Sequence, residues 1–202
     1  MKIWCIRHGT ALHNTMFQYI GRKAYTEKIY TDTPLVDKGK EESLKLGKTW
    51  KNIHKINLIF VSPCLRTMQT AHNIFKNRNI KMFALDELTE YPQGVEYCNK
   101  RKTVTELKKL FPNVDYSLLE ETPKYWKDGD IYETEKELLN RINSLKKILL
   151  NYTQRNICIV SHSSLLKGLF FGKLECLEKE LAHCFPYEYT ITETDSQNLS
   201  LS

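Results

Sequence analysis

The chain has 202 residues, of which 41% are hydrophobic, 11% aromatic and 27% charged. This composition is typical of a globular protein and excludes a disordered or collagen-like chain. The net charge of +6 is spread along the sequence, which weakly favours an anionic ligand. No basic stripe with interleaved aromatic residues supports nucleic-acid binding. The apolar runs are far shorter than the ~20 residues that cross a bilayer, and the first residues lack a secretory segment, so we expect a cytoplasmic protein without a membrane partner.

The first half of the chain predicts alternating strands and helices. Their order is a β-prone strand over residues 2–6, a segment without clear periodicity over 10–33, a helix over 36–53 and a buried strand over 58–61. Ser62 and Pro63 are then typical of a helix start, since serine caps unpaired amides and proline suits the first helical position. We expect that helix to end near Phe75.

The second half continues the alternation. Its predicted elements are a strand over 80–85, an acidic loop over 86–96, a helix over 103–110, an irregular stretch over 113–129, an amphipathic helix over 133–152, a strand over 156–160, a helix that ends near Phe171 and a late strand over 188–192. No repeat or low-complexity linker interrupts this order. We therefore expect a single α/β domain over residues 1–202.

Basic and imidazole side chains follow three of the predicted strands. Arg7 and His8 come directly after the first strand, Arg66 lies in the first turn of the helix after the second, and His162 follows the strand over 156–160. Because ligands of open α/β sheets bind beyond the carboxyl ends of the parallel strands, we expect these residues to meet. Two helix N-termini with unpaired amides would face the same crevice. The combination favours a phosphate dianion as the ligand.

Three motifs carry a family resemblance. They are Arg7-His8-Gly9-Thr10 followed by Asn14, the block Ser62-Pro63-Cys64-Leu65-Arg66-Thr67-Met68-Gln69-Thr70-Ala71, and Ser161-His162-Ser163. In this order they resemble the histidine phosphatase superfamily, also called phosphoglycerate mutase-like. Further matches are Gly21 seven residues after Asn14, residues 32–35 with Gly39, and Leu88-Thr89-Glu90 with Gly94. The resemblance covers nearly the whole chain and implies a three-layer αβα sandwich, with helices on both faces of a mostly parallel sheet.

The resemblance implies a catalytic set of His8, Glu90 and His162. His8 would attack phosphorus and form a phosphohistidine, as suits an imidazole with a reference pKa of about 6.5. Glu90 would protonate the leaving group and later activate water. Glu87 stays open as an alternative acid, because Leu85-Asp86-Glu87 fits the same Leu-x-acid pattern.

The remaining implied site residues bind the substrate. Arg7 and Arg66, with His162, would hold the three non-bridging phosphoryl oxygens, so that neither a metal nor a cofactor is required. Asn14, Gly21 and Ser163 would complete the binding site for a small phosphorylated substrate.

Superfamily members divide mainly into phosphatases and mutases. Cofactor-dependent phosphoglycerate mutases resemble one another in an E-R-H-Y-G block that is absent here. Cys98-Asn99-Lys100-Arg101 resembles the C-D-K-R element of a phosphatase branch, with Asn99 in place of aspartate, so Lys100 and Arg101 are candidate contacts to an acidic substrate. We expect a metal-independent phosphatase for small phosphomonoesters. A mutase and a catalytically silent module that binds phosphorylated ligands remain alternatives, and the segments 10–33 and 91–126 would set specificity.

Overall fold

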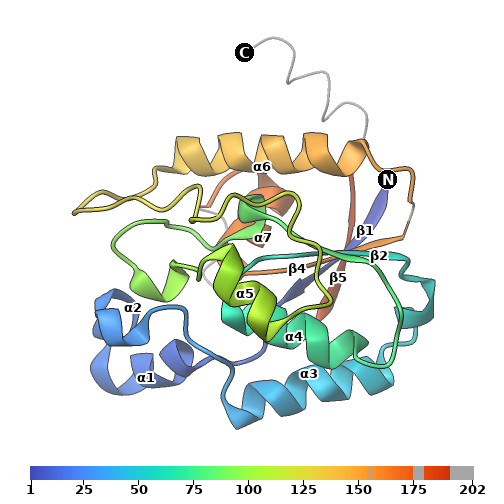
Figure 1. Ribbon diagram of the computed structural model, residues 1–202, viewed down its shortest axis with the longest axis horizontal. Helices are drawn as coiled ribbons and strands as arrows, with labels where there is room; N and C mark the ends of the chain where they lie inside the picture. The colour runs from blue at the N-terminus through green and yellow to red at the C-terminus, as the bar shows by residue number, and fades with distance from the viewer. Residues whose placement is uncertain (155, 175–179, 192–202) are drawn as a thin grey trace.

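A five-stranded sheet forms the centre of the computed structural model, which describes residues 1–154, 156–174 and 180–191 (Figure 1). The strand order is β3-β2-β4-β1-β5, and every neighbouring pair is parallel except β1 with the edge strand β5. The strands are β1 (Lys2–Arg7), β2 (Leu58–Val61), β3 (Met82–Ala84), β4 (Ile157–Ser161) and β5 (Pro186–Thr190). The expected mostly parallel α/β sheet is confirmed, and the carboxyl ends of β1, β2 and β4 meet at one edge.

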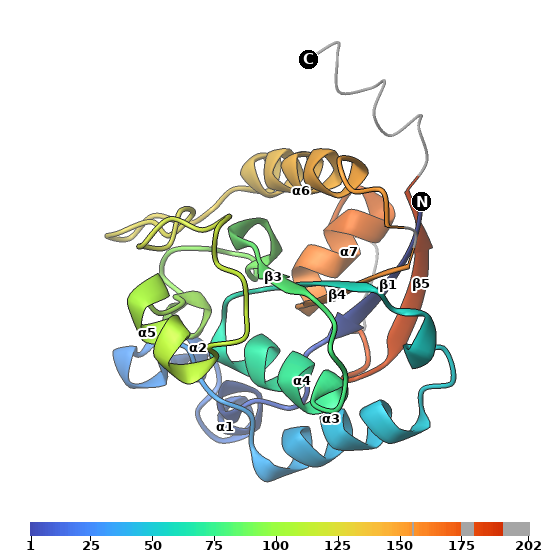
Figure 2. The ribbon, with the colours of Figure 1, turned by 45° about the vertical axis from the view of Figure 1, so that its right-hand side comes forward.

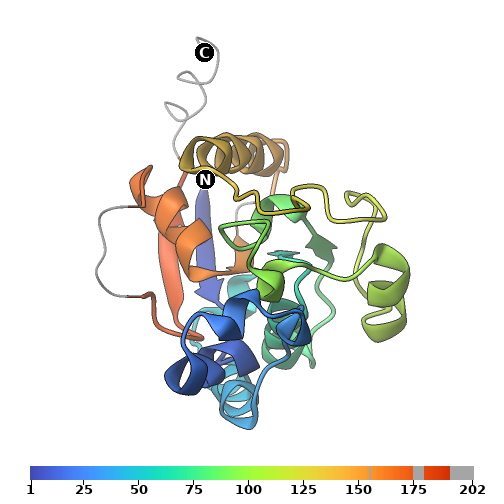
Figure 3. The ribbon, with the colours of Figure 1, turned by 90° about the vertical axis from the view of Figure 1, so that its left-hand side faces the viewer.

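Helices cover both faces of this sheet. Figures 1 and 2 show α6 and α7 on one face and α3 and α4 on the other. Figure 3 views the molecule from the side on which α1 and α2 lie. The α-helices are α1 (Leu12–Ile20), α2 (Lys23–Thr26), α3 (Asp37–Thr49), α4 (Leu65–Phe75), α5 (Val104–Leu110), α6 (Glu135–Leu150) and α7 (Ser163–Phe171), and short 3-10 helices span Lys28–Tyr30, Ile53–Lys55, Asp86–Leu88 and Tyr97–Asn99. None of the described helices is long and apolar enough to cross a membrane.

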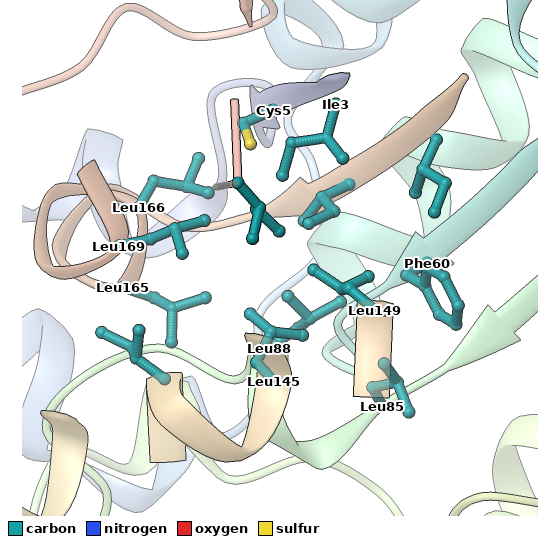
Figure 4. Close-up of a cluster of buried hydrophobic side chains, with 14 of the residues drawn as sticks. Ile3, Cys5, Phe60, Leu85, Leu88, Leu145, Leu149, Leu165, Leu166 and Leu169 are labelled. Atoms are coloured by element: carbon teal, nitrogen blue, oxygen red, sulfur yellow. The ribbon is translucent and has the colours of Figure 1, made fainter. Parts of the chain in front are cut away.

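Alternating side chains of the central strands fill two cores. On β1, Ile3 and Cys5 pack with α6 and α7, whereas Trp4 and Ile6 pack with α3 and α4. The strands β2 and β4 alternate in the same way. Figure 4 shows the first core, in which leucines of α6 and α7 meet the sheet. Because a one-residue slip would exchange the two cores, this packing fixes the register and the positions of the residues just past each strand.

Most predicted elements are present with bounds shifted by a few residues. The amphipathic helix begins after Thr134, whose side chain accepts a hydrogen bond from the amide of Glu137. The third strand starts at Met82 and the late strand at Pro186. Thr192, the last residue of the predicted late strand, lies outside the described residues.

Two local predictions are wrong. Ser62 does not cap a helix, because α4 begins at Leu65 and the Ser62 hydroxyl is hydrogen-bonded to His162 instead. The segment 10–33, which shows no clear periodicity, contains α1 and α2. The helix α1 buries only His13, so it presents no apolar stripe to the core that a pattern could reveal.

Candidate active site

A pocket of about 310 Å³ lies beyond the end of β1. Its lining includes five residues that the sequence singles out: Arg7, His8, Asn14, Arg66 and Glu90. His162 packs edge-on against the His8 ring, with 5.1 Å between the ring centroids. The residues that follow three separate strands are therefore gathered at one place, as the sequence predicts.

The contacts of the His8 ring fix its tautomer. Its Nδ1 lies 2.7 Å from the carbonyl oxygen of Gly9, which can only accept, so Nδ1 carries the proton. Its Nε2 lies 3.2 Å from Nε of Arg66, a permanent donor, so Nε2 accepts that hydrogen bond with its lone pair. The ring thus presents an unprotonated nitrogen toward the guanidinium.

His8 is also held in its neutral form. The ring is buried, and burial is the main reason that the pKa of His8 lies well below its ordinary value of 6.5. The positive charge of Arg66 is the next cause, followed by His162 and Arg7. Since a neutral imidazole needs no separate base, His8 can act as a nucleophile throughout the neutral pH range.

Arg66 is fully buried and held from three sides. Its Nη1 donates to the carbonyl oxygen of Cys98 at 2.6 Å, and its Nη2 donates to Oδ1 of Asn99 at 2.9 Å. With Nε directed at His8, the guanidinium plane has little freedom. Asn99, the residue that departs from the family element, therefore helps to hold the arginine next to His8.

Two buried nitrogen atoms beside His8 lack a partner. Among the residues that the structure describes, neither Nε of Arg7 nor Nδ1 of His162 has a hydrogen-bond partner. The other ring nitrogen of His162 lies 2.8 Å from the Ser62 hydroxyl, and Nη1 of Arg7 donates to the carbonyl oxygen of Leu181. Buried polar atoms are rarely left unpaired in native proteins, so this pair indicates a site for an oxygen-rich anion.

The side chain of Glu90, from the loop after β3, lies against the N-terminus of α7. Its carboxylate accepts hydrogen bonds from the amides of Tyr91 at 2.8 Å and Leu165 at 3.2 Å. Burial nevertheless raises the pKa of Glu90 above its ordinary value of 4.5, and the Tyr91 amide only partly opposes this shift. A carboxyl group with a raised pKa, in the same pocket as His8, is suited to donate and accept a proton.

The two helix N-termini do not offer free first amides to a ligand, contrary to the expectation. At α4 the Leu65 amide donates to Oδ1 of Asp32, and at α7 the amides of Ser164 and Leu165 donate to Glu90. Side chains from distant segments satisfy these donors because unpaired amides at a buried helix end are costly. The donors that an anion could still reach here are therefore mainly positive side chains.

The three other residues predicted to complete the binding site differ in how they relate to the pocket. Asn14 lines the pocket while its Oδ1 accepts a hydrogen bond from the Ala11 amide at the start of α1. Ser163 is buried at the start of α7 and accepts from the Leu181 amide. Gly21 does not line the pocket. It ends α1 instead, with a φ of 58° that favours glycine.

Lys100, Arg101 and Glu87 also lie outside the pocket lining. Arg101 forms a buried two-point ion pair with Asp86, at 2.6 and 2.7 Å, which uses the guanidinium structurally. Lys100 lies over the Trp126 ring. Glu87 accepts from Lys124 and Tyr125, away from His8. These partners are not visible in the sequence, where the three residues only lie in or near the acidic loop.

Several pocket residues were missed by the sequence interpretation. They come mainly from α1, α2 and the loops near the site, and they include His13, Phe17, Tyr25, Glu96 and Glu180. The segments 10–33 and 91–126, which were expected to set specificity, supply all of them except Glu180. No group of three or more His, Cys, Asp or Glu side chains in the described part of the chain is arranged to hold a metal ion.

Comparisons with known proteins match this site and fold. The family model of the histidine phosphatase superfamily (branch 1) matches residues 3–198. The phosphoglycerate mutase-like protein 1 of Arabidopsis thaliana is 30% identical over 215 residues, which covers 91% of this chain and 73% of the relative.

Two solved structures share the fold. The α-ribazole phosphatase from Shigella flexneri has a TM-score of 0.65 at 20% identity and covers 96% of this chain and 92% of its own. The ecdysone phosphate phosphatase from Bombyx mori, in complex with tungstate, has a TM-score of 0.64 at 16% identity. The match covers 93% of this chain and 88% of the phosphatase chain. Together with the family match over nearly its whole length, the gathering of Arg7, His8, Arg66 and His162 at one pocket shows that the chain belongs to branch 1 of the histidine phosphatase superfamily.

Proposed function

We propose that this protein is a metal-independent phosphatase that hydrolyses small phosphomonoesters through a phosphohistidine on His8. The observation that carries the proposal is the lone pair on His8 Nε2, which accepts from Arg66, together with the buried nitrogens of Arg7 and His162 that find no partner within the described part of the chain. A phosphoryl group in this position would receive donors on its non-bridging oxygens. Preorganised positive donors stabilise the charge of the transition state most strongly.

The first step transfers the phosphoryl group to the protein. Nε2 of His8 forms a bond to phosphorus while the ester P–O bond breaks in line with it. The leaving oxygen takes the proton of Glu90, whose raised pKa keeps that proton available. The Arg66 Nε–H loses its acceptor once the Nε2 lone pair is bonded to phosphorus, and a phosphoryl oxygen beside Nε2 takes over as acceptor while the guanidinium stays in place.

The second step returns the protein to its starting form. The Glu90 carboxylate accepts a proton from water, and the water oxygen forms a bond to phosphorus. The P–N bond breaks, its electron pair returns to Nε2 of His8, and inorganic phosphate leaves. Glu90 is protonated again, so protons and electrons balance over the cycle.

A mutase is the second candidate, favoured by the name of the 30% identical Arabidopsis relative. A mutase would return the phosphoryl group to a hydroxyl of the substrate instead of to water. Conversion of 3-phosphoglycerate to 2-phosphoglycerate that depends on priming with bisphosphoglycerate would support it. The absence of the E-R-H-Y-G block favours hydrolysis.

The test is phosphate release from a panel of phosphomonoesters in the presence of EDTA. We expect release by the purified protein and background rates for the His8→Ala variant. A wild-type protein that hydrolyses none of the panel, or that requires an added metal, would contradict the proposal. A catalytically silent binding module would bind the esters without releasing phosphate.

A further inference from the structure

We infer that the substrates of this pocket carry a planar, single-ring organic group and no second acidic group. The inference rests on the proposed function and names the substrate class for it. It comes from a combination of side chains beyond His8, where a stacked aromatic pair and three carboxyl groups share one pocket lining.

The aromatic pair consists of Phe17 from α1 and Tyr25 from α2. Their rings stack with 5.1 Å between centroids and 19° between planes, and both line the pocket. Phe17 is 43% exposed, although it sits beside buried polar groups. A large apolar ring left open at the mouth of a polar pocket indicates contact with an apolar part of the ligand.

A third lining residue, His13, holds this wall in place. The His13 ring packs edge-on against Tyr25, with 5.5 Å between centroids, and its Nδ1 is hydrogen-bonded to the Thr33 hydroxyl. Burial raises the pKa of Tyr25 to about 12, so its hydroxyl stays neutral. A rigid, neutral aromatic wall favours a flat ring, because offset stacking needs two planar partners.

The charges of the pocket argue against a second acidic group on the substrate. Arg7 and Arg66 are its basic lining residues in the described part of the chain, and both lie at the phosphoryl site beside His8. The carboxyl groups of Glu90, Glu96 and Glu180 also line it, and Glu180 is already paired with Arg7. Once the phosphoryl group holds the two arginines, a further carboxylate or phosphate would face the carboxylates of Glu96 and Glu180, while Glu90 carries the proton of the first step.

Glu96 has partners of its own, but they add no basic residue to the described pocket lining. Its carboxylate is paired with Arg22, a largely exposed surface residue, and it also accepts from the Asn99 side chain. Lys100 and Arg101, which could neutralise an acidic substrate, lie outside the lining. The volume of about 310 Å³ is at the lower end of the ~300–1,000 Å³ typical of ligand pockets, which favours a single ring.

The test compares four esters that release phosphate from the same CH2–O group. They are benzyl, cyclohexylmethyl, 4-carboxybenzyl and 4-(aminomethyl)benzyl phosphate. The first two differ in planarity but leave as alkoxides of similar basicity, so the ratio of their kcat/KM values reports the aromatic wall. We expect benzyl phosphate to be preferred about threefold to tenfold, the range of an aromatic contact. The carboxyl group should lower kcat/KM about tenfold, and the aminomethyl group should not lower it.

Matched variants assign the preference to the named side chains. Phe17→Leu and Tyr25→Leu keep apolar volume but remove a ring, and each should bring the ratio of benzyl to cyclohexylmethyl phosphate close to one. Tyr19→Leu is the control, because Tyr19 lies on the same helix, is 76% exposed and does not line the pocket. Glu96→Gln should reduce the penalty of the 4-carboxybenzyl ester.

Calorimetry of the four esters with the His8→Ala variant measures binding without hydrolysis. It therefore separates the proposed ligand class from the proposed phosphatase activity. Binding in the expected order without hydrolysis by the wild type would support the ligand class and contradict the phosphatase. Hydrolysis of all four esters with equal kcat/KM, or with 4-carboxybenzyl phosphate preferred, would overturn the ligand class and leave the phosphatase standing. An absence of binding would overturn the ligand class as well.

Discussion

Nε of Arg66 donates a hydrogen bond to Nε2 of His8 across 3.2 Å, while the opposite nitrogen of the ring faces the Gly9 carbonyl oxygen. The two contacts together allow only the tautomer with a lone pair on Nε2. The same guanidinium also helps to lower the pKa of His8. One buried arginine therefore both orients the His8 ring and adds to the effect of burial, which is the main reason that the ring stays unprotonated.

The pH dependence follows from the two shifted groups. The pKa of His8 lies well below 6.5, so His8 is active as the free base down to acidic pH. The pKa of Glu90 lies above 4.5, and its proton is lost as the pH rises through that raised value. We expect kcat for benzyl phosphate to be highest on the acidic side of neutrality and to fall toward alkaline pH.

A substrate with a better leaving group tests whether the fall of kcat toward alkaline pH comes from loss of the Glu90 proton. In 4-nitrophenyl phosphate the leaving oxygen needs little protonation, so the first step should depend less on Glu90. Pre-steady-state rates of nitrophenol release should fall less with rising pH than those of benzyl alcohol release. Activity that instead rises through a pKa near 6.5 would indicate an ordinary, unshifted His8.

Asn99 is expected to act through Arg66. Asn99→Ala removes the acceptor of Nη2 and frees the guanidinium, which should lower kcat/KM by about 100-fold, the cost of a misplacement of about 1 Å. Asn99→Asp restores the acceptor and should recover at least part of the loss. Equal losses in the two variants, with unchanged thermal stability, would show that Asn99 does not position Arg66.

Glu180 is expected to compete with the phosphoryl group for Arg7. Its carboxylate lies 3.3 Å from Nη1 of Arg7 and is largely exposed. Glu180→Gln removes the negative charge but keeps the shape, so inorganic phosphate should inhibit the variant at about threefold to tenfold lower concentration. The inhibition constants of the wild type and the variant measure this directly. Weaker inhibition of the variant would mean that Glu180 helps to bind phosphate.

The positions of His8 and His162 were predictable because each directly follows a buried apolar strand. Along β1 and β4 the two cores make the sequence continuously apolar, so the strand ends are visible in the chain itself. The helix start after Ser62 was not predictable in detail. Its first amide is paired with Asp32, thirty-three residues earlier, and no local pattern encodes such a long-range cap.

The substrate side of the pocket was the least predictable part. Phe17 and Tyr25 lie on short helices and line the pocket instead of joining the hydrophobic core, so periodicity gives no signal for them. Lys100 and Arg101 illustrate the opposite error. A basic pair near an acidic loop looks like a substrate contact in sequence, but burial and the Asp86 carboxylate give Arg101 another role.

The structural role of Arg101 is testable by stability. Arg101→Ala leaves the buried Asp86 carboxylate without its ion-pair partner, so the free energy of unfolding should fall by about 3–5 kcal/mol. Lys100→Ala is the matched control. The Lys100 ion pair with Asp128 is long and exposed, so its loss should change stability by less than about 1 kcal/mol. Urea unfolding of the two variants compares them, and similar small losses would contradict the role assigned to Arg101.

Glu90→Gln tests the central claim most directly, because it removes the group that activates water while leaving His8 in place. With 4-nitrophenyl phosphate this variant should release nitrophenol in a single burst and then stall as a phosphohistidine. Rapid quenching at alkaline pH followed by peptide mass spectrometry should place the phosphoryl group on His8. A burst with the phosphoryl group on another residue, or steady turnover in which no phosphorylated His8 can be trapped, would contradict the account.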